Sequence, residues 1–319
     1  MMGSQQRNFC KVIGVIVVSA LTTADMIEAL EETGRYRVLD LYRQTDGYHD
    51  LSGLPTVCRA LYIDTETTGL EHDADIIELA AVQVEYDPAT GRLGRILGSH
   101  SWLEQPVSGK PVPVEVTVLT GLTNDMLTGQ RIDEPAVLDL LSNSHLVISH
   151  NAAFDRPKLE TRLPAFARKP WACTVADLDW QAEGIATARL DYVAFRLGFM
   201  FGGAHRGEID CLAGIEVLSR TLPRSGTRTM SALLTRARQA TVRVWALGSP
   251  YGAKDDLKRR GYRWNDGAYP GSPKAWYRDI RETDEATELE WLKVNAHCSG
   301  LAVRLTARDR HSGRAMAVP

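Results

Sequence analysis

Three extended runs joined by turns, and then a short buried run among helical segments, constrain most strongly what this chain can fold into. Residues 59–64, 76–86 and 96–103 each have the composition and length of a strand, and Pro-Ala-Thr-Gly at 88–91 is turn chemistry. The three runs predict an antiparallel meander. Residues 145–149 are a short apolar run that predicts a buried strand.

Helical segments follow the meander. Residues 134–142, 189–198 and 208–222 look helical, and another helix is expected to begin at Asn151, because asparagine is a favourable capping residue. Strands that alternate with helices after a meander predict an α/β domain with a mixed sheet.

The length of 319 residues favours about two domains. Residues 23–43 look helical, with Thr22 or Thr23 as the cap and Gly34 as a stop. We therefore expect five segments, namely a partly helical N-terminal extension (1–57), the α/β domain (58–222), a linker running into a basic helix (223–240), a small α+β domain rich in basic and aromatic residues (241–300) and a frayed tail (301–319).

The composition argues against a membrane, fibrous or disordered protein. Charged residues make up 24%, an ordinary globular value, and no apolar run reaches the roughly 18 residues of a membrane span. At 12–21, the best candidate, we expect a buried strand, with a weak secretory signal as the alternative. The five cysteines are scattered without a CxxC pair, which favours a reducing cytoplasm over a disulfide framework.

The formal net charge of -3 hides an uneven division along the chain. Residues 58–222 carry 14 basic and 23 acidic side chains, whereas residues 223–319 carry 18 basic and 10 acidic ones. Acidic groups collect cations and basic groups collect phosphates, so the two parts suit different ligands.

Two acidic residues lie two positions apart where the first strand ends. Side chains at i and i+2 of a strand project from the same face, so Asp64 and Glu66 present two carboxylates side by side. Adjacent anions repel and need a cation or a proton, and oxygen-only ligands suit Mg²⁺ or Mn²⁺. For this segment alone, a solvated strand end is the alternative.

Two further segments supply acidic residues. Asp155 lies about one turn into the helix that Asn151 opens, after a central strand, where open α/β sheets form sites. His205 and Asp210 are too far apart around a helix to face one site, so we expect His205 on a glycine-flanked loop and Asp210 on the following helix. Taken singly, Asp155 is typical of a first-turn acid that suits the helix dipole, and His205 of a bystander.

The three motifs occur together and in one order, as DTETTG from Asp64, HNAAFD from His150 and HxxxxD from His205. With these motifs, the stretch 58–222 resembles the DEDDh (DnaQ-like) 3′–5′ exonuclease family. Residues 118–123 resemble a secondary landmark of that family, without the histidine that often stands just before it.

The resemblance implies a ribonuclease H-like mixed sheet flanked by helices and a hydrolase that releases nucleoside monophosphates from the 3′ end. It also implies two Mg²⁺ (or Mn²⁺) ions that act on the scissile phosphate. His205 would be the general base, because an imidazole with an ordinary pKa near 6.5 accepts a proton at neutral pH. Backbone groups of Thr65 and Thr67 would contact the terminal nucleotide. By motif, the metal ligands would be Asp64, Glu66, Asp155 and Asp210.

Several other residues near the motifs are better interpreted as structural. His150 adjoins the second motif but is expected to point away from Asp155 and to pack at the start of the helix. The remaining interpretations are a supporting role for Glu78, caps or surface acids for Asp177 and Asp191, and small hydrophobic side chains for Cys173 and Cys211.

Basic and aromatic residues are interleaved in the C-terminal part, where residues 236–281 carry 11 basic and 4 acidic side chains. Aromatic rings can stack on bases while lysine and arginine meet phosphates, which favours nucleic-acid binding. The alternative is a small domain that packs its tryptophans inside or docks a partner. The densest patch comprises Lys258, Arg259, Arg260 and Trp264.

The sequence therefore favours metal-dependent hydrolysis of nucleic acid from a free 3′ end, with single-stranded DNA as the first substrate and RNA as another. Two alternatives stay open. One is a polymerase-associated or scaffold subunit with auxiliary cleavage, and the other is a nucleic-acid-binding protein with a relic site. The expected partners are nucleic acid and a polymerase or repair protein, with no membrane contact and a cytoplasmic location.

Overall fold

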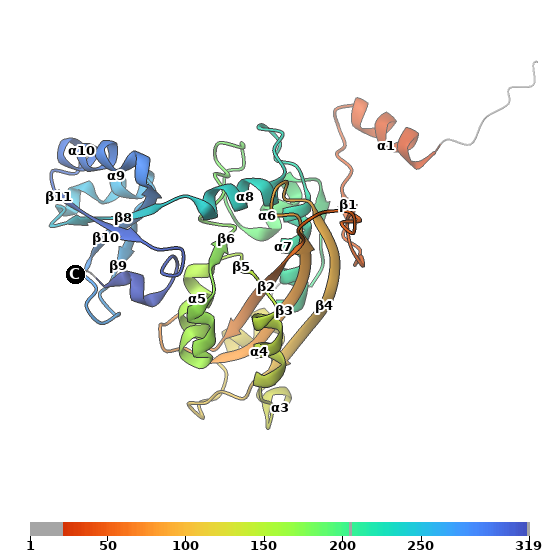
Figure 1. Ribbon diagram of the computed structural model, residues 1–319, viewed down its shortest axis with the longest axis horizontal. Helices are drawn as coiled ribbons and strands as arrows, with labels where there is room; N and C mark the ends of the chain where they lie inside the picture. Colours follow the sequence, from red (N-terminus) through yellow and green to blue (C-terminus); the bar gives the residue numbers. More distant parts are fainter. Residues whose placement is uncertain (1–21, 204–205, 318–319) are drawn as a thin grey trace, which may run out of the picture. The chain divides into compact units, whose positions relative to one another are not determined.

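The computed structural model describes residues 22–203 and 206–317, and Figure 1 shows the chain as a ribbon. The chain divides after Asp40 into two compact units. The apolar run at 12–21, for which we expected a strand or a signal, lies outside the described residues. Among the helices that are described, none is long and apolar enough to cross a membrane.

The first unit contains helix α1 (Thr23–Glu32), and the two-residue strand β1 (Asp40–Leu41) begins at its end. Thr22 caps the helix, because its hydroxyl accepts a hydrogen bond from the Asp25 backbone N–H at 3.2 Å. The predicted cap is therefore confirmed. The helix predicted over 23–43 is too long, since Gly34 turns the chain out of the helical conformation at a φ of 66°.

A five-stranded mixed sheet lies at the centre of the second unit. Its strands are β2 (Cys58–Thr67), β3 (Ile76–Tyr86), β4 (Leu93–Leu103), β5 (Leu146–Ser149) and β6 (Trp171–Cys173). Their order is β4-β3-β2-β5-β6, in which β2, β3 and β4 pair antiparallel while β5 runs parallel to β2 and to β6. The predicted meander and mixed sheet are confirmed.

Helices cover both faces of this sheet. Successive residues of its strands therefore pack into two different hydrophobic cores, one on each face. The helices are α2 (Val114–Thr120), α3 (Asn124–Leu127), α4 (Glu134–Ser142), α5 (Ala152–Arg162), α6 (Leu190–Arg196), α7 (Gly207–Ser219) and α8 (Thr229–Arg238), with the short strand β7 (Phe199–Met200) and the 3₁₀ turn η1 (Pro164–Arg168) between them. On β2, Tyr62 packs into a core with α6, α7 and α8, whereas Leu61 and Ile63 pack with α4 and α5. Each strand in the middle of the sheet is therefore buried on both sides.

A second, smaller sheet follows α8. It consists of β8 (Thr241–Leu247), β9 (Arg263–Asn265), β10 (Ala275–Arg281) and β11 (Ser299–Leu305) in the antiparallel order β11-β8-β10-β9. Helices α9 (Lys254–Arg259) and α10 (Glu285–Asn295) pack on it through a core that includes Val244, Leu257 and Leu292. Short 3₁₀ turns occur at η2 (Tyr251–Ala253), η3 (Glu282–Asp284) and η4 (Gly313–Met316). The expected small α+β region is confirmed.

Two expectations about the segments around this sheet differ from the structure. The chain does not fray after Gly300, because β11 pairs along β8 and completes the sheet. Within the predicted linker at 223–240, α8 packs Met230 and Leu233 into the core beneath the first sheet. Because Leu41 onward forms one compact unit, a domain boundary near this helix stays a prediction.

The segment after β11 fastens the small sheet to helix α5. Arg156 on α5 is fully buried and donates hydrogen bonds to the backbone carbonyls of Arg308 and Arg310. The Arg310 guanidinium forms an ion pair with Asp177, and both side chains are buried. Asp177 also accepts a hydrogen bond from the Cys173 backbone N–H at 2.9 Å. We had expected a cap or a surface acid at Asp177, whereas it is a buried structural anion.

This buried pair yields a prediction for stability. Replacing Arg310→Met leaves the Asp177 carboxylate buried without its main cation, and losing one partner of such a pair costs about 3–5 kcal/mol. The free energy of unfolding, measured by chemical denaturation, is expected to fall by about that amount. Arg304→Met is the matched control, since Arg304 pairs with Glu282 at the surface and its loss should cost less than about 1 kcal/mol. Equal losses for the two variants would contradict the prediction.

Candidate active site

Strand β2 and helix α7 bring three carboxylates together. Asp64 and Glu66 lie near the C-terminal end of β2, and Asp210 lies in the first turn of α7. One oxygen from each of the three lies within 4.8 Å of the others. Packing of α7 on the sheet therefore brings together residues that are far apart in the sequence, as the motifs predicted. Asp210 is on the helix as expected, while His205 lies outside the described residues.

Helix α7 can approach β2 this closely because it carries a glycine where it meets the sheet. A Cβ atom at Gly207 would lie 2.8 Å from the Ala80 Cβ on β3, closer than real Cβ contacts, and 3.5 Å from Asp64 Oδ2. Any side chain at this position would therefore push the start of α7 away from the sheet. Since Asp210 lies one turn further along, its place beside Asp64 depends on this glycine.

Asp155 reaches the same cavity from helix α5, which follows β5. Its Oδ1 accepts hydrogen bonds from the backbone N–H and the hydroxyl of Thr65, at 3.1 and 2.7 Å, and the Ser149 hydroxyl donates to its Oδ2. Asn151 occupies the cap position as predicted, although its side chain makes no capping hydrogen bond. The carboxylate of Asp155 is therefore fixed by Thr65 and Ser149 and not by the cap.

Burial raises the pKa values of Asp64, Glu66 and Asp155, and neighbouring carboxylates add to the effect for the first two. Burial, with the charges of Asp210 and Glu78, raises the pKa of Glu66 to about 8. Burial also raises the pKa of Asp155 to about 6, against the opposing effect of the hydrogen bonds from Ser149 and Thr65. The pKa of Asp64 lies well above its usual range, through burial and then the charges of Asp155 and Glu66. A cluster of oxygen donors that resists ionisation is satisfied by divalent cations, so these residues fit Mg²⁺ or Mn²⁺.

Glu78 is a further buried acid that the sequence interpretation left in a supporting role. It lies directly opposite Glu66 across the β2–β3 pair and is fully buried. The Ser101 hydroxyl donates to it at 2.6 Å, and the Arg206 guanidinium lies 3.8 Å from its other oxygen. Glu78 is the single charged residue in the run 76–82, and this isolation within a buried strand is the signal that could have drawn attention to it.

The acidic cluster opens into a cavity of about 570 Å³. Apolar side chains also line it, among them Leu70, which is 86% exposed, and Leu119, which is 54% exposed. The cavity therefore combines a charged floor with an apolar wall. The structure also places Thr67, Phe154, Arg189, Asp191 and Phe201 along its lining.

The two threonines of the first motif are engaged within the protein. The Thr65 N–H and hydroxyl both serve Asp155, and the Thr67 hydroxyl donates to the Gly69 carbonyl at 2.6 Å. Both residues line the cavity, so their contact with a terminal nucleotide stays a prediction.

His150 has the structural role that the sequence suggested. Its ring nitrogens lie 2.7 Å from the Thr174 hydroxyl and 2.7 Å from the Ala188 carbonyl. Burial lowers its pKa to about 4, so the ring is neutral at physiological pH. Although His150 contributes to the cavity lining, a neutral imidazole with both nitrogens engaged is poorly suited to accept a proton from water.

The C-terminal patch is separate from the acidic cavity. Arg259 pairs with Asp256, and Arg260 pairs at 3.0 Å with the buried Glu288. Lys258 is exposed at the end of α9, and Trp264 on β9 is 54% exposed, with its ring 5.5 Å from that of Trp276. The other tryptophans of this region are more buried than Trp264, and Trp245 lies fully inside.

The fold and the site together define a class. The site's carboxylates meet at the C-terminal end of a central strand, where open α/β sheets form sites, and their oxygens suit divalent cations. Residues 61–218 match the RNase_T family model, described as "Exonuclease". This part of the chain is therefore an exonuclease domain of that DnaQ-like family, as the motifs predicted.

Among curated proteins, the chain is similar to "DNA polymerase III PolC-type" from Clostridium perfringens, with 31% identity over 189 residues that cover 54% of this chain. It spans only 12% of the length of that relative. It is also 29% identical over 167 residues to "DNA polymerase III subunit epsilon" from Aquifex aeolicus, covering 50% of this chain and 78% of that protein.

The chain is also similar to solved structures of exonucleases, at low sequence identity. One is Exonuclease X in complex with 5′ overhanging duplex DNA, with 24% identity, a TM-score of 0.39 and coverage of 55% of this chain and 99% of that chain. Another is E. coli Exonuclease I in complex with a dA16 oligonucleotide, with 12% identity, a TM-score of 0.45 and coverage of 70% and 63%.

The raised pKa of Glu66 predicts how the metal-free protein responds to pH. Because Glu66 titrates near 8 when folded and near 4.5 when unfolded, folding takes up protons between these values. The metal-free protein should therefore lose stability as pH rises from about 5 to 8. Glu66→Gln cannot ionise, so its melting temperature at pH 8 is expected to exceed that of the wild type, with a smaller difference at pH 5.

Thermal melts in EDTA and in Mg²⁺ measure this effect. Mg²⁺ should raise the melting temperature of the wild type more than that of Glu66→Gln, because the variant has lost one oxygen anion of the cluster. Glu290→Gln makes the same chemical change at an exposed position and should alter neither melt. A wild type whose metal-free stability rises between pH 5 and 8 while that of Glu66→Gln stays flat would contradict the assignment.

Proposed function

We propose that this protein is a metal-dependent 3′–5′ exonuclease that hydrolyses nucleic acid from a free 3′ end and releases nucleoside monophosphates. Single-stranded DNA is the favoured substrate, and RNA is the other candidate. The observation that supports the proposal most directly is the group of Asp64, Glu66 and Asp210 within 4.8 Å, inside a cavity of the exonuclease domain.

Each polar group of the motifs has a part in this proposal. Asp64, Glu66, Asp155 and Asp210 would hold two Mg²⁺ or Mn²⁺ ions, which supply charge stabilisation for the attacking and leaving oxygens when bound. His205 would accept the proton of the attacking water, since the other histidine of the motifs, His150, is buried and neutral. Asp155 keeps its orientation through Thr65 and Ser149.

The apolar wall of the cavity suits the sugar and base of the terminal nucleotide. Leu70 follows the first motif directly and Leu119 lies on α2, and both line the cavity. A base packed on these leucines would place its 5′ phosphate toward the carboxylates. Apolar contact of this kind is insensitive to base identity, as a nuclease that degrades any sequence requires.

The C-terminal sheet supports a role in holding the strand. The ring of Tyr269, from the loop between β9 and β10, lies edge-on to that of His72 at 4.5 Å. His72 belongs to the loop that follows the first motif, and the Glu71 carbonyl of that loop accepts a hydrogen bond from Lys158 on α5 at 2.5 Å. Lys258 on α9 and Trp264 on β9 thus belong to a region that contacts, through Tyr269, the loop following the first motif.

Polymerase association is a second candidate role, because the Aquifex aeolicus relative is named as a subunit of DNA polymerase III. Its sequence aligns with 50% of this chain. This role and the exonuclease activity are compatible. Co-purification with a polymerase would favour the subunit role, and the intact set of carboxylates argues against a relic site that only binds.

A digestion assay tests the proposed activity. End-labelled single-stranded DNA, duplex DNA and RNA are incubated with Mg²⁺ or Mn²⁺, and the products are resolved by length over time. The wild type should shorten strands from the 3′ end. Asp64→Ala should reduce digestion to background, and His205→Ala should slow it by about 10²- to 10⁴-fold, the usual effect of losing a general base.

The matched control for this assay is Asp125→Ala, which removes an exposed carboxylate on α3 outside the cavity lining and should leave digestion unchanged. Activity that survives in Asp64→Ala would indicate a different site or a contaminating nuclease, and the proposal would fail. Preference among the three substrates identifies the nucleic acid.

The C-terminal surface has its own test in the salt dependence of binding. Lys258→Ala should weaken single-strand binding and lower the salt slope by about one, the contribution of one phosphate contact. Trp264→Ala should cost about 1–3 kcal/mol of binding free energy if its ring stacks on a base. Lys293→Ala on α10 removes a positive charge from the same sheet region and serves as the control. Unchanged affinity and slope in both variants would favour the packing or docking interpretation.

A further inference from the structure

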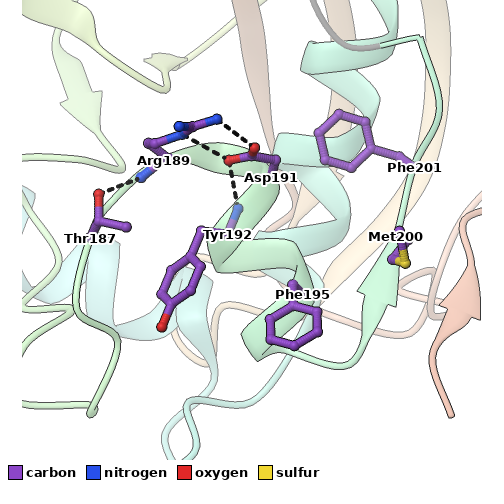
Figure 2. A pocket seen from close by; sticks show the side chains of 7 residues that line it. All are labelled: Thr187, Arg189, Asp191, Tyr192, Phe195, Met200 and Phe201. Carbon is purple, nitrogen blue, oxygen red and sulfur yellow. Dashed lines mark hydrogen bonds and ion pairs between the residues drawn. The ribbon is translucent and has the colours of Figure 1, made fainter. Parts of the chain in front are cut away.

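A second pocket lies beside the catalytic cavity. It has a volume of about 410 Å³, within the range of ligand-binding pockets, and Figure 2 shows the side chains around it. We call it the aromatic pocket. It is lined by Thr187, Arg189, Asp191, Tyr192, Phe195, Met200 and Phe201.

The aromatic pocket adjoins the site of proposed catalysis. The two hollows share part of their lining, namely Arg189, Asp191 and Phe201, so they lie next to each other. The catalytic cavity also contains Asp64 and Asp210 of the acidic cluster. A molecule that enters the cavity can therefore extend into the aromatic pocket across this shared wall.

The lining of the aromatic pocket is chemically suited to a flat, uncharged ring. Tyr192 and Phe195 lie on α6 with ring centroids 6.3 Å apart, and Phe195 is 40% exposed while Met200 is 54% exposed. Tyr192 and Phe201 pack partly against the core, while Phe195 and Met200 are exposed, so the pocket offers an apolar surface that is supported from beneath. Aromatic faces at a surface are the usual platform for bases of a single strand.

The charges at the rim favour a base over a phosphate. Arg189 forms a two-bond pair with Asp191, at 3.2 and 2.8 Å, so its positive charge is neutralised locally (Figure 2). The Tyr192 backbone N–H also donates to this carboxylate at 2.7 Å, which fixes the start of α6. A phosphate would meet a neutral ion pair here, whereas a base would meet aromatic rings.

We propose that the aromatic pocket binds the base of the nucleotide immediately upstream of the one that is removed. This inference rests on the proposed exonuclease function and deepens it. A scissile phosphodiester joins two nucleotides, and the catalytic cavity, with its leucine wall, accommodates the terminal one. The preceding nucleotide must leave the acidic cluster on the other side, and the adjoining aromatic pocket receives its base without reading its identity.

The test separates substrates that have one nucleotide from those that have several. The methyl ester of thymidine 5′-monophosphate contains a single nucleotide, and its methyl leaving group has no ring to place in the aromatic pocket, whereas a thymidine hexanucleotide has an upstream base that can enter it. Phe195→Ala should raise the KM for the hexanucleotide about tenfold, because one base loses its stacking surface. The kcat on the hexanucleotide and the kinetics on the ester should change less than twofold.

Two further variants keep the test decisive if Phe195→Ala folds poorly. Phe195→Trp retains an aromatic face and should keep or lower the KM for the hexanucleotide. Leu138→Ala removes an exposed apolar side chain from α4, outside the lining of both hollows, and should alter neither substrate. The dissociation constant of the fluorescently labelled hexanucleotide, measured in Ca²⁺, reports binding without turnover.

The outcomes distinguish the inference from the function on which it rests. A wild type that binds the hexanucleotide but hydrolyses neither substrate with Mg²⁺ or Mn²⁺ would overturn the proposed function. A wild type that is active, with a Phe195→Ala variant whose KM and dissociation constant for the hexanucleotide match it, would overturn the inference alone. In that case the pocket would suit a side chain of a partner protein instead of a base. Equal losses on the ester and the hexanucleotide would also overturn it, because Phe195 would then act on catalysis or folding.

Discussion

Mutual repulsion among buried carboxylates is the constraint on which the rest of this structure depends. Asp64, Glu66, Asp155 and Glu78 face one another where little water can separate their charges, and burial raises the pKa values of the first three. Folding alone does not favour such an arrangement, since each ionised pair destabilises the metal-free protein. The fold therefore has to hold these groups together rigidly, and under the proposed function a divalent cation would relieve their repulsion on binding.

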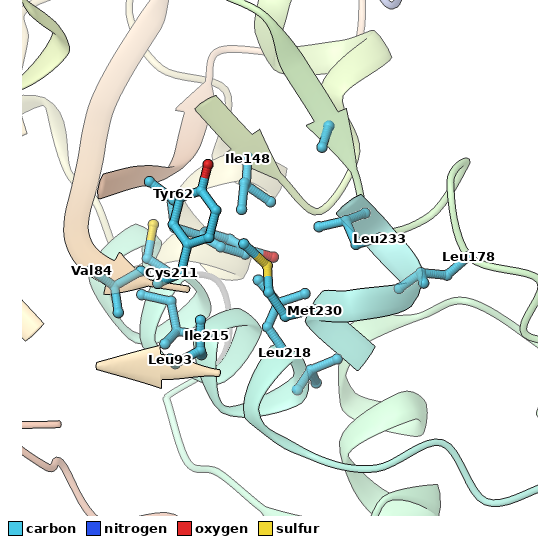
Figure 3. Packing of buried hydrophobic residues seen from close by; sticks show 14 of the residues in the cluster. Tyr62, Val84, Leu93, Ile148, Leu178, Cys211, Ile215, Leu218, Met230 and Leu233 are labelled. Carbon is cyan, nitrogen blue, oxygen red and sulfur yellow. The ribbon is translucent and has the colours of Figure 1, made fainter. Parts of the chain in front are cut away.

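The rigidity comes from how closely helix α7 packs on the sheet. Figure 3 shows Tyr62 of β2 in one buried cluster with Cys211, Ile215 and Leu218 of α7. Glycines at 207 and 214 remove the side chains that would otherwise collide with Ala80 and Tyr62. Asp210 lies between these two glycines on the helix. The packing of α7 on the sheet thus forms both the apolar core and the acidic site. A change that loosens this packing would also move Asp210 away from Asp64 and Glu66.

Local patterns predicted most of the α/β part, because each element carried its own signal. The runs at 76–86 and 134–142 became β3 and α4 with the same bounds, and the spacing of Asp64 and Glu66 placed both at one end of a strand. What the sequence concealed depends on tertiary contacts. Nothing local shows that the Thr65 hydroxyl orients Asp155, that β11 continues past the predicted boundary at Gly300, or that separate side chains on α6 and β7 enclose a second pocket.

The uneven distribution of charge along the chain can be related to the proposed function. A nucleic acid strand is repelled by an acidic cavity until cations fill it, so attraction toward the site has to come from elsewhere. In an exonuclease of the proposed kind, the 18 basic side chains after residue 222 would supply that attraction. Arg156 and Asp177 hold this part of the chain to the first sheet and its helices through the segment after β11. Under the proposed function, the basic sheet would raise the local concentration of the strand while the aromatic and leucine surfaces position its last two bases. Affinity and catalysis would then reside on different surfaces, although the acidic and basic regions meet in the buried Arg310–Asp177 ion pair.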